Sequence, residues 1–401
     1  MLKKERLMHN LRYFAEVGAT ESEGITRLAF SNDLFLSAEK LVEIISSMDK
    51  CIRYMDKTGS LHVILPAEKD TKEEIVFGSH FDTVPNGGLY DGSAGIAAGI
   101  EVMLHVLEEC KSLKHNLHLI AFNAEEAGPL GGTYASRAML GDISYNIDTI
   151  EVFEKKREQS ELLSNVDYME WDSSSAKAFL ELHIEQGGIL DAEGLDAGVV
   201  TGIFGIRRYV INIEGESNHA GTTPMNQRRD PMVAAAGLVT FINEKAKAYE
   251  GKLVATVGKL EVKPNLESII PQKVELVMEV RSLYNDAMDE LYNAVCLYGS
   301  NIDGINFASK LKVDKPPIML NNSICDAEEK ACEICKIKYK RMPSGAGHDA
   351  KSFAKAGVPT GMIFVPSIDG KSHTPLEYTT DEQLIIGAEI LYETIKLIDN
   401  Y

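Results

Sequence analysis

The chain has 401 residues, with 41 Lys and Arg against 60 Asp and Glu, and a formal net charge of -19. Nucleic acids and anionic membranes are bound by clustered basic side chains, so this acidic balance argues against both partners. At roughly 100–200 residues per domain, the length predicts two or three domains. Hydrophobic residues at 44% and charged residues at 25% are typical of a folded globular protein.

Residues 1–18 carry charges every few positions and lack the apolar core of a signal peptide, so we expect a surface helix there. No run approaches the roughly 18–20 apolar residues of a membrane-spanning helix. The six cysteines are scattered rather than arranged as a disulfide framework, which predicts a reducing, cytoplasmic location. Cys332 and Cys335 have CxxC spacing, but there is no second such pair to complete a zinc site. We expect them to be buried core thiols.

The first half of the chain alternates short apolar runs with helical patterns. Residues 73–80, 116–126 and 179–186 are predicted strands, and residues 93–110 form a helical pattern rich in small side chains. This alternation predicts βαβ units and a mainly parallel sheet. In open α/β sheets, ligands bind at the carboxyl ends of the strands.

The pattern changes near Gly205, where residues 207–217 alternate with the period of two that a half-exposed strand shows. The order of elements that follows is typical of a small two-layer α+β module. The further elements predicted there are a helix at 231–249, strands at 252–262 and 273–283, a helix at 286–298 and a strand at 305–313.

The alternation of helical patterns and apolar runs seen in the first half resumes after Pro316 and Pro317. It comprises a helix from about Ser323, a strand at 361–365 and a final helix. We therefore predict an α/β protein in which an α+β domain is inserted into the catalytic domain. The catalytic domain would comprise residues 1–204 and 318–401, and the insert residues 205–317.

Histidine and acidic side chains occur at five places where a predicted strand ends. The five places are His80 with Asp82, Asp91, Glu125 with Glu126, His183 with Glu185, and His373. Singly, each has an ordinary explanation, such as a turn aspartate or a solvated pair of glutamates. Together they supply the imidazoles and carboxylates that a hydrolytic metal pair uses, and the coincidence favours such a site.

Six segments carry a resemblance to a known family. They are GSHFDTVPNGGLYDG, NAEEAG, LHIEQGG, GESNHAGTTPMNQRRD, SGAGHDA and the loop that contains His373. In this order they resemble the M20 metallopeptidase-like amidohydrolases, and within that clan the branch of allantoate amidohydrolase and N-carbamoyl-L-amino-acid hydrolase. The resemblance spans about residues 1–400. It implies a dinuclear metal domain with an inserted lid and dimerisation domain.

The resemblance also implies a set of metal ligands. His80 and His183 would hold one divalent ion, Glu126 and His373 would hold the other, and Asp91 would bridge the two. Zn, Mn, Co and Ni all bind sites made of imidazole and carboxylate, so the motif leaves the ion open.

Catalytic roles follow from the same resemblance. Glu125 would act as the general base that activates the attacking water and then protonates the leaving nitrogen. Asp82 would hydrogen-bond His80 behind the metal. Consecutive residues of a strand point in opposite directions, so the different tasks of Glu125 and Glu126 imply a bent, loop-like backbone.

Substrate-binding roles come mainly from the insert. His219 would stabilise the oxyanion, and in relatives it reaches the active site of the partner subunit of a homodimer. Arg281 would clamp the substrate carboxylate with its bidentate guanidinium. Gln186, Gly347 and His348 would contact the ureido end and the carboxylate.

The chain departs from the family pattern at Ser268, in the segment Ser268-Ile269-Ile270-Pro271-Gln272, where relatives usually have asparagine. A hydroxyl has one donor, whereas an amide has two donors and an acceptor. Ser268 is therefore a substrate-binding position at which the choice of substrate can differ.

These assignments predict hydrolysis of the ureido or carbamoyl C–N bond of allantoate or an N-carbamoyl-L-amino acid, with release of ammonia and CO2. An alternative within the clan is a dinuclear aminopeptidase or aminoacylase. An alternative of another class is a catalytically inactive protein that binds small molecules on the same scaffold. The presence of all five ligand positions and Glu125 argues against the second alternative.

Overall fold

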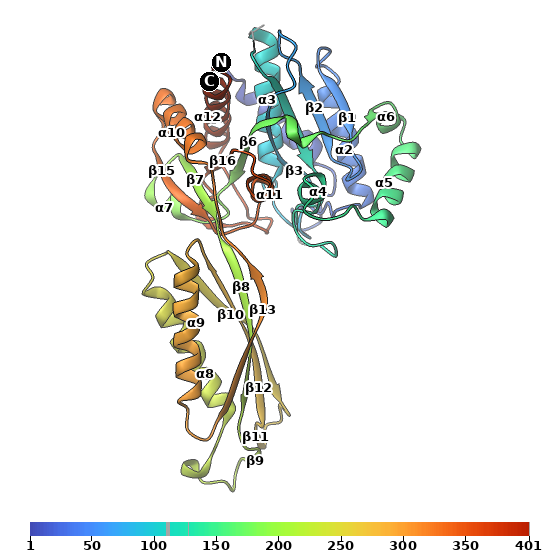
Figure 1. Cartoon of the computed structure of the whole chain (residues 1–401). Helices are drawn as coiled ribbons and strands as arrows, with labels where there is room; N and C mark the ends of the chain where they lie inside the picture. Colours follow the sequence, from blue (N-terminus) through green and yellow to red (C-terminus); the bar gives the residue numbers. More distant parts are fainter. Residues whose placement is uncertain (110–112, 127, 401) are drawn as a thin grey trace. The chain divides into compact units, whose positions relative to one another are not determined.

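The structure is a computed structural model that describes residues 1–109, 113–126 and 128–400, and it divides into two compact units (Figure 1). The first unit runs from Met1 to Thr201 and resumes at Leu320, and the second spans Gly202–Met319. The predicted domain boundaries, after residues 204 and 317, lie close to these limits.

The first unit is a mixed α/β assembly. Its strands are β1 (Ile52–Met55), β2 (Leu61–Leu65), β3 (Glu74–His80), β4 (Asn116–Phe122), β5 (Asp167–Tyr168), β6 (Ala176–Ile184), β7 (Ala197–Ile203), β15 (Tyr339–Ser344) and β16 (Thr360–Val365). Its α-helices are α1 (Lys4–Ala15), α2 (Asn32–Ile45), α3 (Ser93–Glu109), α4 (Tyr134–Met139), α5 (Ile147–Gln159), α6 (Glu161–Ser164), α7 (Ile189–Glu193), α10 (Asn322–Cys335), α11 (Asp349–Lys355) and α12 (Asp381–Asn400). The last residue of the helix predicted over 93–110 lies outside the described residues.

The sheet of this unit has a parallel centre. The strands lie in the order β7-β16-β6-β3-β4-β2-β1-β5, with β15 beside β7. The pairs β16–β6, β6–β3 and β3–β4 are parallel, whereas β7, β2 and β1 pair antiparallel with their neighbours β16, β4 and β2. The predicted mainly parallel α/β class is therefore confirmed, and antiparallel pairs flank its centre.

Glycines let α3 lie unusually close to this parallel centre. A Cβ atom built on Gly95 would lie 2.2 Å from the carbonyl oxygen of Leu182, and one on Gly99 would lie 2.6 Å from the side chain of Leu119. A larger side chain at Gly95 would collide with the backbone of β6, and one at Gly99 would have to displace the side chain of Leu119. The small residues predicted to permit close packing do so, and they bring the start of α3 to the ends of β3 and β6.

The residues of β6 alternate between the two faces of the sheet. On one face, the side chain of Leu182 meets Gly387 of α12. On the other, Phe179 stacks on Phe353 of α11 with ring centroids 3.8 Å apart. His183 shares the face of Phe179, because the two are four residues apart along the strand.

The second unit contains the α+β module predicted for the insert. Its elements are β8 (Gly205–Glu214), β9 (Asn218–His219), α8 (Pro231–Lys247), β10 (Leu253–Lys263), β11 (Ile269–Ile270), β12 (Lys273–Ser282), α9 (Asn285–Ser300), β13 (Asn306–Lys315) and β14 (Ile318–Met319). The antiparallel order is β10-β12-β8-β13. Alternate residues of β12, such as Leu276 and Met278, are buried with Leu238 of α8 and Leu291 of α9 in one core. The short pair β9–β11 extends from the end of this sheet (Figure 1).

Helix α1 buries Leu7, Leu11 and Phe14 along one side, as a surface helix does. Cys332 is fully buried but Cys335 is partly exposed, so the core-thiol prediction is correct for Cys332 and wrong for Cys335. Among the described residues, no helix is long and apolar enough to cross a membrane.

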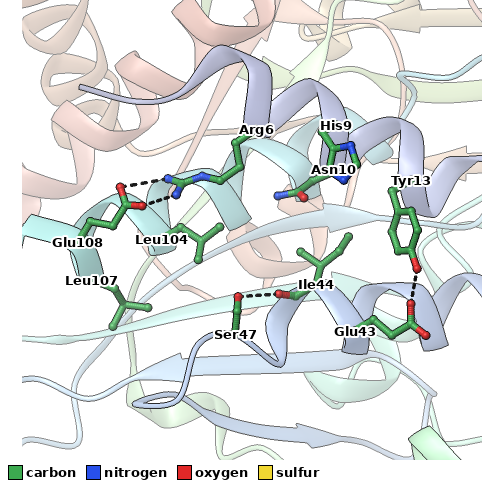
Figure 2. Close-up of a pocket in the computed structure, with 10 residues that line it drawn as sticks. All are labelled: Arg6, His9, Asn10, Tyr13, Glu43, Ile44, Ser47, Leu104, Leu107 and Glu108. Atoms are coloured by element: carbon green, nitrogen blue, oxygen red, sulfur yellow. Dashed lines mark hydrogen bonds and ion pairs between the residues drawn. The ribbon is translucent and has the colours of Figure 1, made fainter.

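A groove of about 650 Å³ lies between α1, α2 and α3 (Figure 2). Its apolar lining includes Ile44 and Leu104, and Glu43 accepts the hydroxyl of Tyr13. Arg6 binds Glu108 across the groove. The groove contains none of the site residues predicted from the sequence.

Candidate metal centre and active site

The acidic and histidine side chains predicted from the sequence converge in the first unit. His80 is the last residue of β3, and Asp91 lies just before α3. Glu125 and Glu126 follow β4 in the chain, and His183 is the penultimate residue of β6. The loop after β16 supplies the remaining candidate ligand, His373. Parallel strands end at one edge of a sheet, which is why segments so far apart in sequence meet here.

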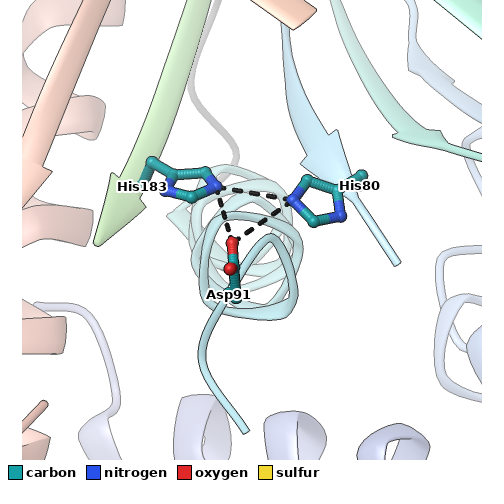
Figure 3. Close-up of side chains that lie close together, drawn as sticks. All are labelled: His80, Asp91 and His183. Carbon is teal, nitrogen blue, oxygen red and sulfur yellow. Dashed lines mark hydrogen bonds and ion pairs between the residues drawn. The ribbon is translucent and has the colours of Figure 1, made fainter. Parts of the chain in front are cut away.

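The two oxygens of the Asp91 carboxylate face different histidines. Its Oδ1 atom lies 3.4 Å from Nε2 of His80 and 3.2 Å from Nε2 of His183 (Figure 3). Its Oδ2 atom lies 3.2 Å from Nε2 of His373, which is itself 3.5 Å from Oε1 of Glu126. One carboxylate with an oxygen directed at each group is the arrangement that bridges two metal ions.

The tautomers of the two strand histidines suit metal binding. Nδ1 of His80 donates to the backbone carbonyl of Asp82 at 3.0 Å, and Nδ1 of His183 donates to that of Ile184 at 2.9 Å. In the neutral rings, Nε2 then carries no hydrogen, and its lone pair is directed at Asp91. Oδ1 of Asp91 is buried and has no hydrogen-bond donor. These donor atoms fit a divalent cation.

A glycine permits this close arrangement. Gly92 has a φ of +63°, and a Cβ atom there would lie 2.4 Å from the carbonyl oxygen of His80 and 2.6 Å from its ring. Any other residue at this position would force Asp91 and His80 apart.

Burial and charge shift the pKa values of the acidic groups in opposite directions. Burial alone would raise the pKa of Asp91, but His183, His373 and His80, when their rings are protonated, donate to it and hold its pKa well below its usual value. Burial raises the pKa of Glu125 well above its usual value, and the nearby carboxylates add to the effect. Asp91 is thus an anion suited to cations, whereas Glu125 is suited to hold a proton.

The backbone after β4 bends, as predicted for the paired glutamates. Ala124 has a φ of +58°, and residues 123–126 lie outside any strand. The two side chains take different directions: Oε2 of Glu125 lies 4.0 Å from Nε2 of His80, while Glu126 approaches His373.

The Asp82 side chain, predicted to hydrogen-bond His80, lies beside that ring but makes its shorter hydrogen bonds elsewhere. Its Oδ1 atom lies 3.6 Å from Nδ1 of His80, and the ring donates to the Asp82 backbone carbonyl instead. The carboxylate accepts the backbone N–H groups of Glu125 and Glu126 at 3.0 and 3.1 Å. Asp82 therefore fixes the loop of the candidate base. A second departure is Glu185, which accepts the N–H groups of Ile189 and Leu190 at the start of α7.

Two predicted substrate contacts lie beside the candidate metal ligands. Gln186 has a φ of +59°, and its Nε2 atom donates to Oδ2 of Asp91 at 2.9 Å. His348 is only 1% exposed, and its ring lies 4.6 Å from that of His183. Burial lowers the pKa of His348 well below its usual value, so this ring is neutral. Gly347 is exposed.

The other predicted substrate contacts lie in the second unit. His219 is on β9, Ser268 precedes β11, and the Ser268 carbonyl accepts the N–H of Ala220 at 2.9 Å. Nδ1 of His219 accepts the N–H groups of Gly221 and Thr222 at 2.9 and 3.2 Å. Since Nδ1 is an acceptor, Nε2 of the exposed ring carries the proton and is a hydrogen-bond donor.

Arg281 lies on β12 of this second unit, where its Nε atom donates to Glu279 at 2.8 Å. Glu279 also accepts a bond from Arg208 on the neighbouring strand β8. The guanidiniums of Arg281 and Arg208 hold the pKa of Glu279 below its usual value despite its burial, so the acid is ionised between two cations.

Sequence reasoning missed an acidic pair beneath the site. Burial and the charge of Glu181 raise the pKa of Asp349 to about 8, and Oδ1 of Asp349 accepts the hydroxyl of Ser136 at 2.6 Å. The position of Asp349 in GAGHDA, next to His348, was the signal that could have identified it.

The chain is similar to known proteins over nearly its full length. The sequence signature of "Peptidase family M20/M25/M40" matches residues 76–397. The N-carbamoyl-L-amino acid amidohydrolase of Geobacillus stearothermophilus is 34% identical, over 98% of each chain. The allantoate amidohydrolase of Escherichia coli (strain K12) is 32% identical, over 97% of this chain and 96% of its own.

A similar solved structure is that of a putative amidohydrolase/peptidase from Burkholderia cenocepacia. It has a TM-score of 0.92 and 27% identity, and the match covers 100% of this chain and 99% of the other. The chain belongs to peptidase family M20/M25/M40. The resemblance predicted from the six motifs is confirmed.

Proposed function

We propose that this protein is a metal-dependent amidohydrolase that cleaves the ureido or carbamoyl C–N bond of allantoate or an N-carbamoyl-L-amino acid. The observation that carries the proposal is the Asp91 carboxylate, whose two oxygens face the pair His80–His183 and His373. The amidohydrolases of Geobacillus stearothermophilus and Escherichia coli support it, because they match this chain over nearly its full length.

The predicted enzyme class, a hydrolase of carbon–nitrogen bonds other than peptide bonds, is confirmed by these relatives. Their printed activities favour it over the aminopeptidase and aminoacylase alternative. The inactive binding protein is disfavoured because the candidate ligands lie together and Glu125 is present beside them.

Two divalent ions are proposed, drawn from Zn, Mn, Co and Ni. His80 and His183 would hold one, Glu126 and His373 the other, and Asp91 both. Ions bound there act as Lewis acids, which acidify water and polarise the substrate carbonyl.

Glu125 is the proposed general base. Its buried carboxylate takes a proton from the attacking water as the water oxygen bonds to the carbamoyl carbon. It then returns this proton to the substituted nitrogen as the C–N bond breaks. One water is consumed, the amine leaves, and the carbamate decomposes to CO2 and ammonia. The raised pKa of Glu125 suits a group that must hold the proton between these two steps.

Five side chains and one glycine are proposed to bind the substrate. The Nε2–H of His219 is the donor for the developing oxyanion, as its tautomer allows. Arg281 binds the carboxylate. The remaining candidates for the ureido end and the carboxylate are Gln186, Ser268, Gly347 and His348.

We also infer a homodimer in which His219 serves the partner subunit. Exposed apolar side chains in the same unit, Met225 and Val233, are consistent with a further interface. A cytoplasmic location is inferred from the free thiols of Cys51, Cys296, Cys325, Cys332 and Cys335.

Glu125→Gln tests the mechanism, and Glu126→Gln is its matched neighbour. With an amide in place of the base, we expect kcat to fall at least about 1000-fold while both ions stay bound. Glu126→Gln should instead release one ion. Undiminished turnover by Glu125→Gln would remove Glu125 from the mechanism.

A further inference from the structure

The carboxylate of Glu377 joins the two loops that carry Asp91 and His373. Its Oε1 atom accepts the backbone N–H groups of Tyr90 and Asp91 at 2.9 and 3.0 Å. Its Oε2 atom accepts the hydroxyl of Ser372 at 3.1 Å, and this hydroxyl also lies 3.3 Å from Oδ2 of Asp91. Both carboxylate oxygens are therefore bonded to the surroundings of Asp91.

Glu377 is held tightly in this place. The residue is 4% exposed. A Cβ atom built on Gly88 would lie 2.3 Å from Oε1 of Glu377 and 2.4 Å from its Cβ. The glycine of the Asp91 loop thus leaves just the space that the acid fills, and the two loops are packed as well as hydrogen-bonded together.

The two halves of the metal centre differ in what supports them. His80 and His183 lie on the buried strands β3 and β6, and each ring is fixed by a backbone carbonyl. Asp91 and His373 lie in loops, and the His373 side chain is 49% exposed. A loop ligand needs support from other residues to keep its position. Glu377 supplies that support for the bridging ligand, Asp91. By accepting the hydroxyl of Ser372, it also holds the residue next to His373.

We propose that Glu377 is a positioning residue that sets the affinity of the ion held by Glu126, His373 and Asp91, with a smaller effect on the ion that Asp91 shares with the strand-held His80 and His183. This inference rests on the proposed function, because it requires a metal pair. Since Glu377 touches neither substrate nor ion in this account, its effect reaches the reaction through Asp91 and Ser372.

The experiment titrates the metal-free, full-length protein with Co²⁺ and records the bound ions and their visible absorption, without assaying activity. Glu377→Leu removes both hydrogen-bonded oxygens. Glu377→Gln keeps an oxygen for the two N–H groups, and its amide can donate to Ser372. Ser372→Ala removes the hydroxyl that connects Oε2 of Glu377 with Oδ2 of Asp91, at a partly exposed position, and serves if Glu377→Leu does not fold.

Asp399 provides a matched control. It is 6% exposed, and its Oδ1 atom accepts the N–H groups of Lys114 and His115 at 3.0 and 2.9 Å, the same arrangement away from the site. Asp399→Leu should lower the thermal stability but leave the affinities for both Co²⁺ ions unchanged.

We expect the wild type to bind two Co²⁺ ions. Removing a residue that supports a ligand typically costs 10–100-fold in affinity, so Glu377→Leu should weaken the second ion at least about tenfold and Ser372→Ala by several-fold. The affinity for the first ion, held by His80 and His183, should stay within about threefold of the wild-type value. Glu377→Gln should bind both ions with affinities within about threefold of the wild type.

Two results would overturn this inference but not the proposed function. One is an unchanged affinity for the second Co²⁺ ion in both Glu377→Leu and Ser372→Ala. The other is an equal loss of that affinity in Asp399→Leu. A wild type that binds fewer than two ions would overturn the metal pair of the proposed function as well.

Discussion

Asp82 holds the backbone of Glu125 in place. Oδ1 of its carboxylate accepts the Glu125 N–H at 3.0 Å, and Oδ2 accepts the N–H of Glu126 at 3.1 Å. The acid lies on the loop after β3 and the glutamates on the loop after β4, so this contact joins two neighbouring strand ends across the site. It assigns Asp82 to the base rather than to the ring of His80.

Asp82→Ala should therefore reduce catalysis more than metal binding. Without the carboxylate, two buried N–H groups lose their acceptor and the base shifts. A displacement of about 1 Å can cost roughly 100-fold in rate, so we expect kcat to fall about 100-fold. Metal affinity should stay within about threefold, because His80 donates to a backbone carbonyl that the substitution retains. Weakened metal binding with an unchanged kcat would instead support the side-chain contact with His80.

This contact shows where sequence reasoning reached its limit. The chain positions of His80, His183 and Asp91 follow from strand patterns, because parallel strands bring their carboxyl ends together. The orientation of Asp82 does not follow, since one residue offers both a carbonyl and a carboxylate to the same ring.

Glu377 was missed for a related reason. It lies 286 residues from Asp91 in the sequence, and the contact exists only once the loops after β3 and β16 are folded beside each other. The positive φ of Gln186, at +59°, is likewise set by tertiary contacts, because glutamine has no intrinsic preference for that conformation. Buried neutral His348 was predicted to touch substrate from its motif alone, which carries no information on burial.

The clamp role of Arg281 predicts selectivity for a charged substrate. A hydrogen bond to a charged group contributes about 1.5–3 kcal/mol, so Arg281→Ala should lower kcat/KM for an N-carbamoyl amino acid roughly 100-fold. Hydrolysis of the matching carboxamide should change less than threefold, since it offers no carboxylate. Equal losses on both compounds would show that Arg281 acts on the fold instead. Glu279→Gln, which alters the ionised partner of Arg281, is the control for the surrounding charge.

A trans role for His219 predicts complementation between inactive variants. Glu125→Gln and His219→Ala subunits, unfolded together and refolded as a mixture, would pair at random. About a quarter of wild-type activity should return, because half of the dimers hold one intact site. No activity above the sum of the separate variants would indicate that His219 serves its own subunit or that subunits do not pair.

A buried network apart from the site predicts how acid affects stability. Nδ1 of His118 donates to Glu74 at 2.8 Å, Nε1 of Trp171 donates to the same oxygen, and His62 lies 2.9 Å from the other ring nitrogen of His118. Burial lowers the pKa of His118 from 6.5 to about 4, so the folded ring is neutral at pH 5.

Because the unfolded chain takes up this proton first, acidification favours unfolding. The contribution of neutral His118 to the free energy of unfolding is complete above pH 6.5 and is lost as the pH falls towards 4. It amounts to roughly 2 kcal/mol between pH 7 and pH 5. Urea unfolding of the wild type and His118→Gln, under the same metal load, should show a pH dependence that is shallower in the variant by about this amount. Parallel profiles would contradict the neutral buried ring.

The proposed reaction is tested most directly by the bond that the metal-loaded protein cleaves. The measurement is ammonia and amine release from allantoate, N-carbamoyl-L-amino acids, 3-ureidopropionate and dipeptides, after the metal-free protein is reconstituted with Zn, Mn, Co or Ni. We predict turnover of allantoate or an N-carbamoyl-L-amino acid, none without metal, and none by Glu125→Gln. Turnover of dipeptides alone would contradict the proposed reaction.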